Sequence, residues 1–176
     1  MIVLRDMRES DIEDYVRWFT RDTEWMRTDA PWETVETTPD GERAGWTEYF
    51  ASVRDLPREA VRRKFEIEWD GKHVGWVSRY TDLEYMDNPD SVPAVGIDIP
   101  EPDYRGRGIG TEALRAFIRY LKDSGFSRVY TQTWSGNAPM LRVAEKLGFV
   151  PVCVMPGYRT VEGRTYDALT LKFEWQ

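Results

Sequence analysis

The sequence predicts an α/β protein in which one mixed sheet carries helices on both faces. Apolar residues recur at the helical spacing i, i+3, i+4, i+7 in four segments, and they alternate in seven others, as strands require. Strands and helices alternate along the chain only in its second half, so the sheet should combine parallel and antiparallel neighbours. The 176 residues fit a single domain, which we place at residues 1–176.

The helical segments each place four apolar side chains on one stripe, and such stripes normally face a core. A capping box of Ser10 and Glu13 should begin the first helix. The four stripes are Ile12/Tyr15/Val16/Phe19, Trp46/Tyr49/Phe50/Val53, Leu114/Phe117/Ile118/Leu121 and Met140/Val143/Ala144/Leu147.

The strand segments include a hairpin, because Asp70-Gly71 separates two alternating runs and is a strong two-residue turn. With the helices they give the order β-α-α-β-β-β-α-β-α-β-β. Residues 21–40 and 82–93 carry Pro with Asp or Asn, and we expect both to form loops near a ligand site. The strands are expected at Ile2/Leu4, Phe65/Ile67/Trp69, Val74/Trp76, Val95/Ile97/Ile99, Val129/Thr131, Val150/Val152/Val154 and Leu169/Leu171/Phe173/Trp175.

Composition excludes several classes of protein. The chain is 41% hydrophobic and 31% charged, without an apolar run of the ~20 residues that span a bilayer. Its charged start is unlike a signal peptide, so we expect a cytoplasmic protein with no membrane partner. A net charge of −7 argues against binding to nucleic acid. A single cysteine, Cys153, and a single histidine, His73, leave little for a metal site; we expect Cys153 in the core and His73 on the surface.

Charge is distributed unevenly along the chain. Residues 1–40 hold 11 acidic against 5 basic side chains, whereas residues 105–146 hold 8 basic against 3 acidic ones. This asymmetry favours two ligands of opposite sign, and a scatter of solvated surface charges is the alternative.

A Gly-rich turn, Arg105-Gly106-Arg107-Gly108-Ile109-Gly110, joins the expected strand at 95–99 to an amphipathic helix. Glycines let the backbone approach a ligand, and the free amides of a helix N-terminus attract anions. A P-loop would need Gly-Lys-Ser/Thr, and a dinucleotide fingerprint would need G-x-G-x-x-G, so ATP and NAD fit poorly. A purely structural turn is the remaining alternative.

Two motifs together resemble the GCN5-related N-acetyltransferase (GNAT) superfamily. Arg105, Gly108 and Gly110 match its Arg/Gln-x-x-Gly-x-Gly/Ala phosphate motif, and Asn137 opens a helix that ends in Glu145-Lys146-Leu147-Gly148-Phe149. The chain is most similar to the branch named for ribosomal-protein N-terminal acetyltransferases, the RimJ/RimL-like branch. The resemblance implies a largely antiparallel sheet of about seven strands and acetyl-CoA as co-substrate.

The resemblance also implies which residues bind the cofactor. The pantetheine arm would lie between the strands at 95–99 and 128–131, and Asn137 would reach it or serve only as a helix N-cap. Arg142 would meet the outer phosphate, whereas Lys146 is expected on a solvated face. The expected contacts are the backbone of Ile97, Asp98 and Ile99 for the pantetheine, and Arg105, Gly106, Arg107, Gly108, Ile109, Gly110 and Thr111 for the pyrophosphate.

The family reaction is direct attack of an amine on the thioester, for which a base must remove the amine's proton. Asp98 is the best-placed carboxylate for that base, although a solvent- or helix-facing strand residue would look the same. The family's acid positions are Ala144 and Met140 here, so neither acid is present. The thiolate would leave unaided, Tyr104 or Tyr158 would replace the acid, or the protein would bind acyl-CoA without turnover.

The expected acceptor site is acidic and aromatic. Asp29 and Glu33 lie where the family's acceptor loop runs, and with Trp25 and Trp32 they would suit a cationic amine, though packed tryptophans would also pin down a loop.

The predicted function is transfer of an acetyl group from acetyl-CoA to a primary amine through a ternary complex. The acceptor is open among a protein N-terminus, a polyamine and an amino-sugar antibiotic, and the acyl group need not be strictly acetyl. A non-catalytic acyl-CoA sensor is the alternative, and a nucleotide-phosphate binder of another fold ranks last. A homodimer is compatible with tryptophans exposed near the chain end.

Overall fold

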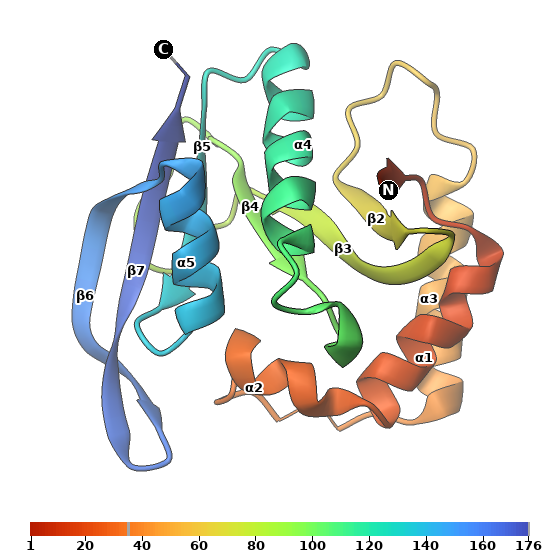
Figure 1. The fold of residues 1–176 in the computed structure, drawn as a ribbon, viewed down its shortest axis with the longest axis horizontal. Helices are drawn as coiled ribbons and strands as arrows, with labels where there is room; N and C mark the ends of the chain where they lie inside the picture. Colours follow the sequence, from red (N-terminus) through yellow and green to blue (C-terminus); the bar gives the residue numbers. More distant parts are fainter. Residues whose placement is uncertain (35, 176) are drawn as a thin grey trace.

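The computed structural model describes residues 1–34 and 36–175, in which seven strands form one sheet of order β1-β2-β3-β4-β5-β7-β6 (Figure 1). All neighbours are antiparallel except β4 and β5, which run parallel. The predicted mixed, largely antiparallel sheet of seven strands is confirmed. The strands are β1 (Ile2–Arg5), β2 (Lys64–Trp69), β3 (Lys72–Tyr80), β4 (Ala94–Asp98), β5 (Arg128–Trp134), β6 (Val150–Val161) and β7 (Arg164–Glu174).

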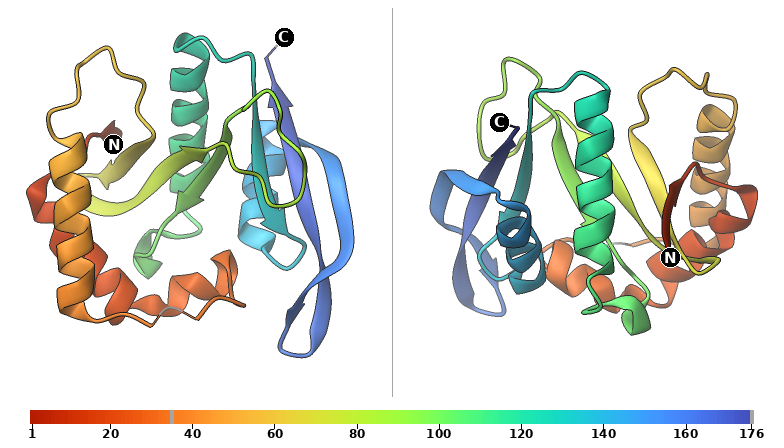
Figure 2. Two further views of the ribbon diagram at one scale, coloured as in Figure 1. Left: turned by 180° about the vertical axis from the view of Figure 1, so that it is seen from behind. Right: turned by 45° about the horizontal axis from the view of Figure 1, so that its top comes forward.

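Helices cover both faces of this sheet, as predicted: α4 and α5 lie on one face, and α3 lies on the other (Figure 2). Each of the four predicted helical segments falls inside an observed helix. These helices are α1 (Ile12–Thr20), α3 (Pro39–Val53), α4 (Ile109–Asp123) and α5 (Ala138–Leu147); a four-residue α2 (Met26–Asp29) and short 3-10 turns at Glu9–Asp11, Thr23–Trp25 and Pro102–Tyr104 complete the set. None of the described helices is long and apolar enough to cross a membrane.

The larger core lies between the sheet and α4. The buried stripe of α4, which includes Leu114, Phe117 and Leu121, packs in one cluster with Val95 of β4 and Val129 of β5. A short segment with the 3-10 turn Pro102–Tyr104 joins β4 to α4, and this packing fixes the helix N-terminus near the open end of β4.

A second cluster lies on the opposite face and is unusually aromatic. Tyr15, Trp18 and Trp25 are buried there against Trp76 of β3. The stripe of α3 was expected to face the core, but Trp46 and its three partners are only partly buried. The reason is that α3 packs mainly on α1 and forms the outer layer.

His73 was expected on the surface, and this prediction is wrong, because only 6% of the residue is exposed. Its Nδ1 lies 3.1 Å from Asp14 and its Nε2 lies 3.0 Å from Glu66. Burial lowers the pKa of His73, but the two carboxylates outweigh burial and raise it. Since helices cover both faces of the sheet, alternation along β3 no longer separates a buried from an exposed side.

Two further local predictions changed. Cys153 is half-buried, with its thiol 3.3 Å from the carbonyl oxygen of Tyr85, rather than fully in the core. The expected capping box of Ser10 and Glu13 is wrong, because α1 begins only at Ile12 and a 3-10 turn precedes it. That turn is closed instead by the backbone N–H of Arg8, which donates to the carboxylate of Asp11 over 2.7 Å.

Candidate functional site

The site begins where β4 and β5 separate. Their register contains one pair, Ala94 with Tyr130, supported by a 2.9 Å bond from the Tyr130 N–H to the Pro93 carbonyl. One step further, the Thr131 hydroxyl donates to the Val95 carbonyl over 2.8 Å. Beyond this point the described residues of the two strands share no further register pairs, so a wedge opens toward the N-terminus of α4.

The backbone of β4 presents alternate residues to this wedge. The carbonyls of Pro93 and Val95 point to β5, so alternation directs the polar groups of Ile97 the same way. The carbonyl of Asp98 faces β3 instead, because a Cβ built on Gly75 would lie 2.0 Å from that oxygen. Asp98 therefore enters the site through its side chain, and Ile97 offers the free backbone groups.

A cavity of about 810 Å³ occupies the wedge and joins two ends of opposite charge. The cofactor end contains the Gly-rich turn, the start of α4 and one side of α5. The acceptor end contains α2, the loop after it and residues of the 82–93 segment. The two stretches expected as ligand-site loops thus both line the cavity, although the first also contains α2.

The N-terminus of α4 forms an uncapped cradle at the cofactor end. Gly108 is the N-cap residue with a φ of 84°, a left-handed conformation that favours glycine, and its side-chain-free position leaves the amides open. The first helical bond in this turn runs from Glu112 N–H to Gly108, so the N–H groups of Ile109, Gly110 and Thr111 have no partner within the helix. These amides suit a phosphate group.

The two arginines of the Gly-rich turn, both predicted to contact the pyrophosphate, make different contacts. Arg105 donates to the carbonyls of Ile99 (2.8 Å) and Pro100 (2.6 Å) and pairs with Glu24, so it clamps the end of β4 to the 3-10 turn before α2. Arg107 does not line the cavity and lies over the Tyr104 ring at 5.8 Å.

The side chain of Ile109 is buried in the core, so only its amide can serve the cradle.

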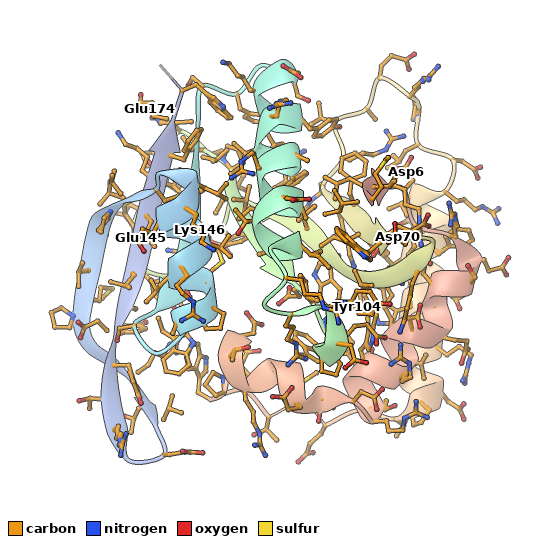
Figure 3. All side chains as sticks on the ribbon, viewed as in Figure 1. Asp6, Asp70, Tyr104, Glu145, Lys146 and Glu174 are labelled. Atoms are coloured by element: carbon orange, nitrogen blue, oxygen red, sulfur yellow. The ribbon has the colours of Figure 1, made fainter. Side chains whose placement is uncertain are left out.

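On the opposite wall, α5 supplies Asn137, Arg142 and Lys146. Tyr104 before α4 and Lys146 on α5 lie on either side of α4 in the view of Figure 3, and both line the cavity. The Asn137 side chain accepts a bond from the Met140 N–H over 3.1 Å, so it is a helix N-cap that also lines the cavity. Lys146 is exposed, as expected for a solvated face, and it also lines the cofactor end of the cavity with Arg142.

Two carboxylates meet at the acceptor end. Burial raises the pKa of Asp98 well above its usual range, the nearby charge of Asp29 raises it further, and Lys64 opposes both. Burial and the charge of Glu33 likewise raise the pKa of Asp29. A carboxylate with a raised pKa is a better proton acceptor than an exposed one.

The four predicted acceptor residues all line the cavity. Trp25 is largely buried and donates to the Trp18 carbonyl over 3.1 Å, which is mainly a packing role. Trp32 already has a cationic neighbour, since the guanidinium of Arg159 lies 4.1 Å from its ring centroid.

Sequence reasoning missed several residues of the acceptor end. Asp82 adds negative charge, whereas Glu84 is paired with Arg159 over 2.6 Å; the clustering of these acids in a Pro-containing loop was a usable signal. Trp134 donates to the carbonyls of Thr28 and Asp29 and so attaches α2 to β5, a long-range contact with no local signature. The Thr133 hydroxyl on β5 is buried without a hydrogen-bond partner among the described residues.

The residues considered for the general acid differ in whether they reach the cavity. Met140 lines the cavity and Ala144 is buried, and neither can donate a proton because a thioether and a methyl group carry no acidic hydrogen. Tyr104 lines the cavity, whereas Tyr158 does not line it and packs edge-on against Tyr85 with ring centroids 5.3 Å apart.

Comparisons with known proteins agree with this geometry. A human alpha/beta-tubulin-N-acetyltransferase 9 is 32% identical over 90 residues, which is 50% of this chain but only 42% of that protein. The chain thus spans less than half the length of that relative. An acetyltransferase from Salmonella typhimurium solved with its cofactor acetyl-CoA shares the fold at a TM-score of 0.72 and 20% identity, covering 99% of this chain and 94% of the other.

A ribosomal-protein-alanine N-acetyltransferase from Brucella melitensis has a TM-score of 0.71 at 18% identity, covering 98% and 99% of the two chains. The model of the acetyltransferase (GNAT) domain matches residues 2–150. This match confirms the predicted resemblance to the GNAT superfamily. The chain therefore belongs to the acetyltransferase (GNAT) domain family.

Proposed function

We propose that the protein transfers an acetyl group from acetyl-CoA to a cationic primary amine within a ternary complex. One observation carries the proposal: a single cavity joins an uncapped helix N-terminus to the paired carboxylates Asp29 and Asp98. The cradle suits the pyrophosphate, the wedge suits the pantetheine arm, and the carboxylates suit the ammonium group of the acceptor.

The reaction follows from this arrangement. Asp98 accepts a proton from the acceptor ammonium, whose pKa is near 10.4 for an alkyl amine. The freed nitrogen attacks the thioester carbonyl carbon and a C–N bond forms. The nitrogen then loses its second proton to solvent, and the C–S bond breaks. CoA leaves as a thiolate, which later takes a proton from solvent or from Tyr104. Because free thiols have a pKa near 8.5, the thiolate is a tolerable leaving group without an acid.

The acceptor is proposed to be a cation because acidic side chains surround its end of the cavity. Asp29, Glu33, Asp82 and Asp98 line it, together with Glu84, which is paired with Arg159; the cationic residues that line the same cavity lie at the cofactor end. This pattern favours a polyamine or an amino sugar over a protein N-terminus that is neutral beyond its α-amine. The predicted cytoplasmic location and single domain remain predictions.

The test measures thiol release from acetyl-CoA with a panel of diamines, amino sugars and Ala-initiated peptides. Asp98→Asn should lower kcat by about 100-fold or more, the usual contribution of a general base, while the Kd for CoA stays unchanged. Asp103→Asn, an exposed carboxylate outside the cavity, is the matched control. CoA binding without thiol release from any acceptor would favour the acyl-CoA sensor instead.

A homodimer is proposed through β6 rather than through tryptophans. Trp175 near the chain end packs on Phe173 and is partly buried, whereas Val150, Val152 and Val154 are 53%, 44% and 48% exposed on the edge strand. An exposed apolar row on a sheet edge favours pairing with another copy. Light scattering should give a dimer mass that Val152→Lys reduces to a monomer.

A further inference from the structure

Lys64 is a buried cation that the proposed reaction leaves unexplained. It begins β2 on the face opposite α4, and its side chain is 10% exposed. The ammonium nitrogen lies above four rings, at 4.1 Å from the centroid of Tyr15, 4.3 Å from Trp46, 4.8 Å from Trp76 and 5.4 Å from Tyr49. Such a cage stabilises a cation through the ring faces without neutralising its charge.

The carboxylate of Glu66 lies near this cation, but it makes its hydrogen bonds with other residues. An oxygen of Glu66 lies 3.9 Å from the Lys64 nitrogen. The other oxygen of Glu66 accepts a bond from the Tyr15 hydroxyl over 2.5 Å and meets His73 at 3.0 Å. Lys64 is therefore only loosely paired, and its field extends to other groups on the same face of the sheet.

Asp98 is such a group, because the strand register brings the two residues onto adjacent rows. Glu66, Trp76 and Asp98 are paired across β2, β3 and β4 in one row. Lys64, Ser78 and Gly96 form the next row, and all six side-chain positions face the same way. Ser78 and Gly96 are small, so the bulky side chain between the caged ammonium and Asp98 is Trp76, whose ring centroid lies 4.8 Å from the ammonium. With strands about 4.8 Å apart, the two α-carbons lie roughly 12 Å from each other.

We propose that Lys64 is a positioning residue of this enzyme, whose caged ammonium favours the carboxylate form of Asp98, the form that accepts the acceptor's proton. The inference rests on the proposed function, because it acts through Asp98 as the base. It supplies what the site otherwise lacks, namely a positive charge that offsets the burial of Asp98 and the repulsion from Asp29.

The charged groups that face Asp98 and Lys64 shift the pKa of each in the direction that their charges require. Asp98 faces Asp29 from α2, which raises the pKa of Asp98, and Lys64 from β2, which lowers it; Tyr80 on β3 has its own pKa raised to about 12, mainly by burial. Lys64 faces Glu66, Asp98 and Asp11, which raise the pKa of Lys64, but burial outweighs them and lowers it to about 8. Tyr15 and Tyr49 contact it as rings. Below pH 8 the cage thus holds a charged ammonium.

The experiment is a pH profile of kcat/KM from pH 5.5 to 9.5 for the wild type and three variants. Lys64→Met keeps an apolar chain of similar length in the cage but removes the charge, so the acidic limb should move to higher pH by about one unit or more. At a fixed pH on that limb kcat/KM then falls about tenfold, whereas the alkaline plateau is unchanged. Lys64→Arg keeps the charge and should keep the wild-type limb, and Lys122→Met removes an exposed charge on α4 and should change nothing.

A second measurement separates this inference from the proposed function. The carboxyl carbon of Asp98 is titrated by NMR in the wild type and in Lys64→Met, each bound to CoA and without turnover. A higher pKa for Asp98 in the variant supports Lys64 even if Asp98→Asn proves fully active, which would refute the proposed base instead. An equal Asp98 pKa in both proteins, or a loss of kcat/KM by the same factor at every pH, overturns the inference.

Discussion

Thr131 and Thr133 stand two residues apart on the same side of β5, yet only one hydroxyl has a partner. Thr131 donates to the Val95 carbonyl, whereas Thr133 lies beyond the point where β4 has diverged. An unsatisfied buried hydroxyl carries a desolvation penalty of about 1–3 kcal/mol. A ligand in the wedge would give the Thr133 hydroxyl the hydrogen-bond partner that β4 does not supply.

A matched pair of variants tests this difference. Thr131→Val should lower the free energy of unfolding by about 1 kcal/mol or more, because it leaves the Val95 carbonyl without its partner. Thr133→Val should leave the stability of the ligand-free protein unchanged or slightly higher, and should weaken CoA binding. Chemical denaturation and calorimetric titration measure the two effects, and equal destabilisation by both variants would contradict the assignment.

Gly108 gives a second prediction at the residue scale. Its φ of 84° makes any side chain strained by about 1–2 kcal/mol, and the same holds for Gly125, with a φ of 97° after the C-terminus of α4. No atom outside the immediate neighbours lies within 4 Å of a Cβ at either glycine. Gly108→Ala and Gly125→Ala should therefore destabilise the fold about equally, but only the first should raise the Kd for CoA. Thermal unfolding with and without CoA separates the two effects.

Between α1 and the β2–β3 hairpin, His73 joins two elements through Asp14 and Glu66. The raised pKa of His73 means that its stabilising charge is fully present below its unfolded value of about 6.5 and is lost as pH rises through the folded pKa. The Tm difference between the wild type and His73→Gln should therefore be largest near pH 6 and shrink toward pH 9. A difference that does not change with pH would show that packing alone accounts for the effect.

The main elements could be predicted from the sequence because each carries its own periodicity. The α4 stripe and the Asp70-Gly71 hairpin were both placed correctly by local patterns. The burial of His73 could not be predicted, because it depends on α1 folding back over the sheet. The role of Arg105 was also hidden, since its carbonyl partners are set by how the turn closes.

The candidate site also has one part that local sequence patterns predict and another that depends on long-range contacts. The cradle follows from glycines adjacent in sequence, so its location was predictable. The acceptor end is assembled from α2, the 82–93 segment and β5. It depends on contacts such as those of Trp134 with the carbonyls of Thr28 and Asp29, 106 and 105 residues away. Single-sequence patterns contain no such information.

For the whole molecule, the wedge predicts that CoA stabilises the seam between β4 and β5. Bonds from the pantetheine arm to the free groups of Ile97 would take the place of the missing strand pairing. Hydrogen exchange at residues 94–99 and 128–134 should slow on CoA binding, whereas exchange in β1 and β2 should change little beyond the general stabilisation. Equal slowing throughout the sheet would indicate global stabilisation only.

The single Ala94–Tyr130 pair also has a consequence for how the chain could be divided. On one side of it, β1 to β4 form an antiparallel sheet that α4 covers; on the other, β7 pairs with both β5 and β6. A cut in the turn at Gly125, between α4 and β5, would thus give two fragments, each with an intact sheet of its own. Such fragments should associate weakly alone and far more tightly with CoA bound between them, so that CoA would promote their association.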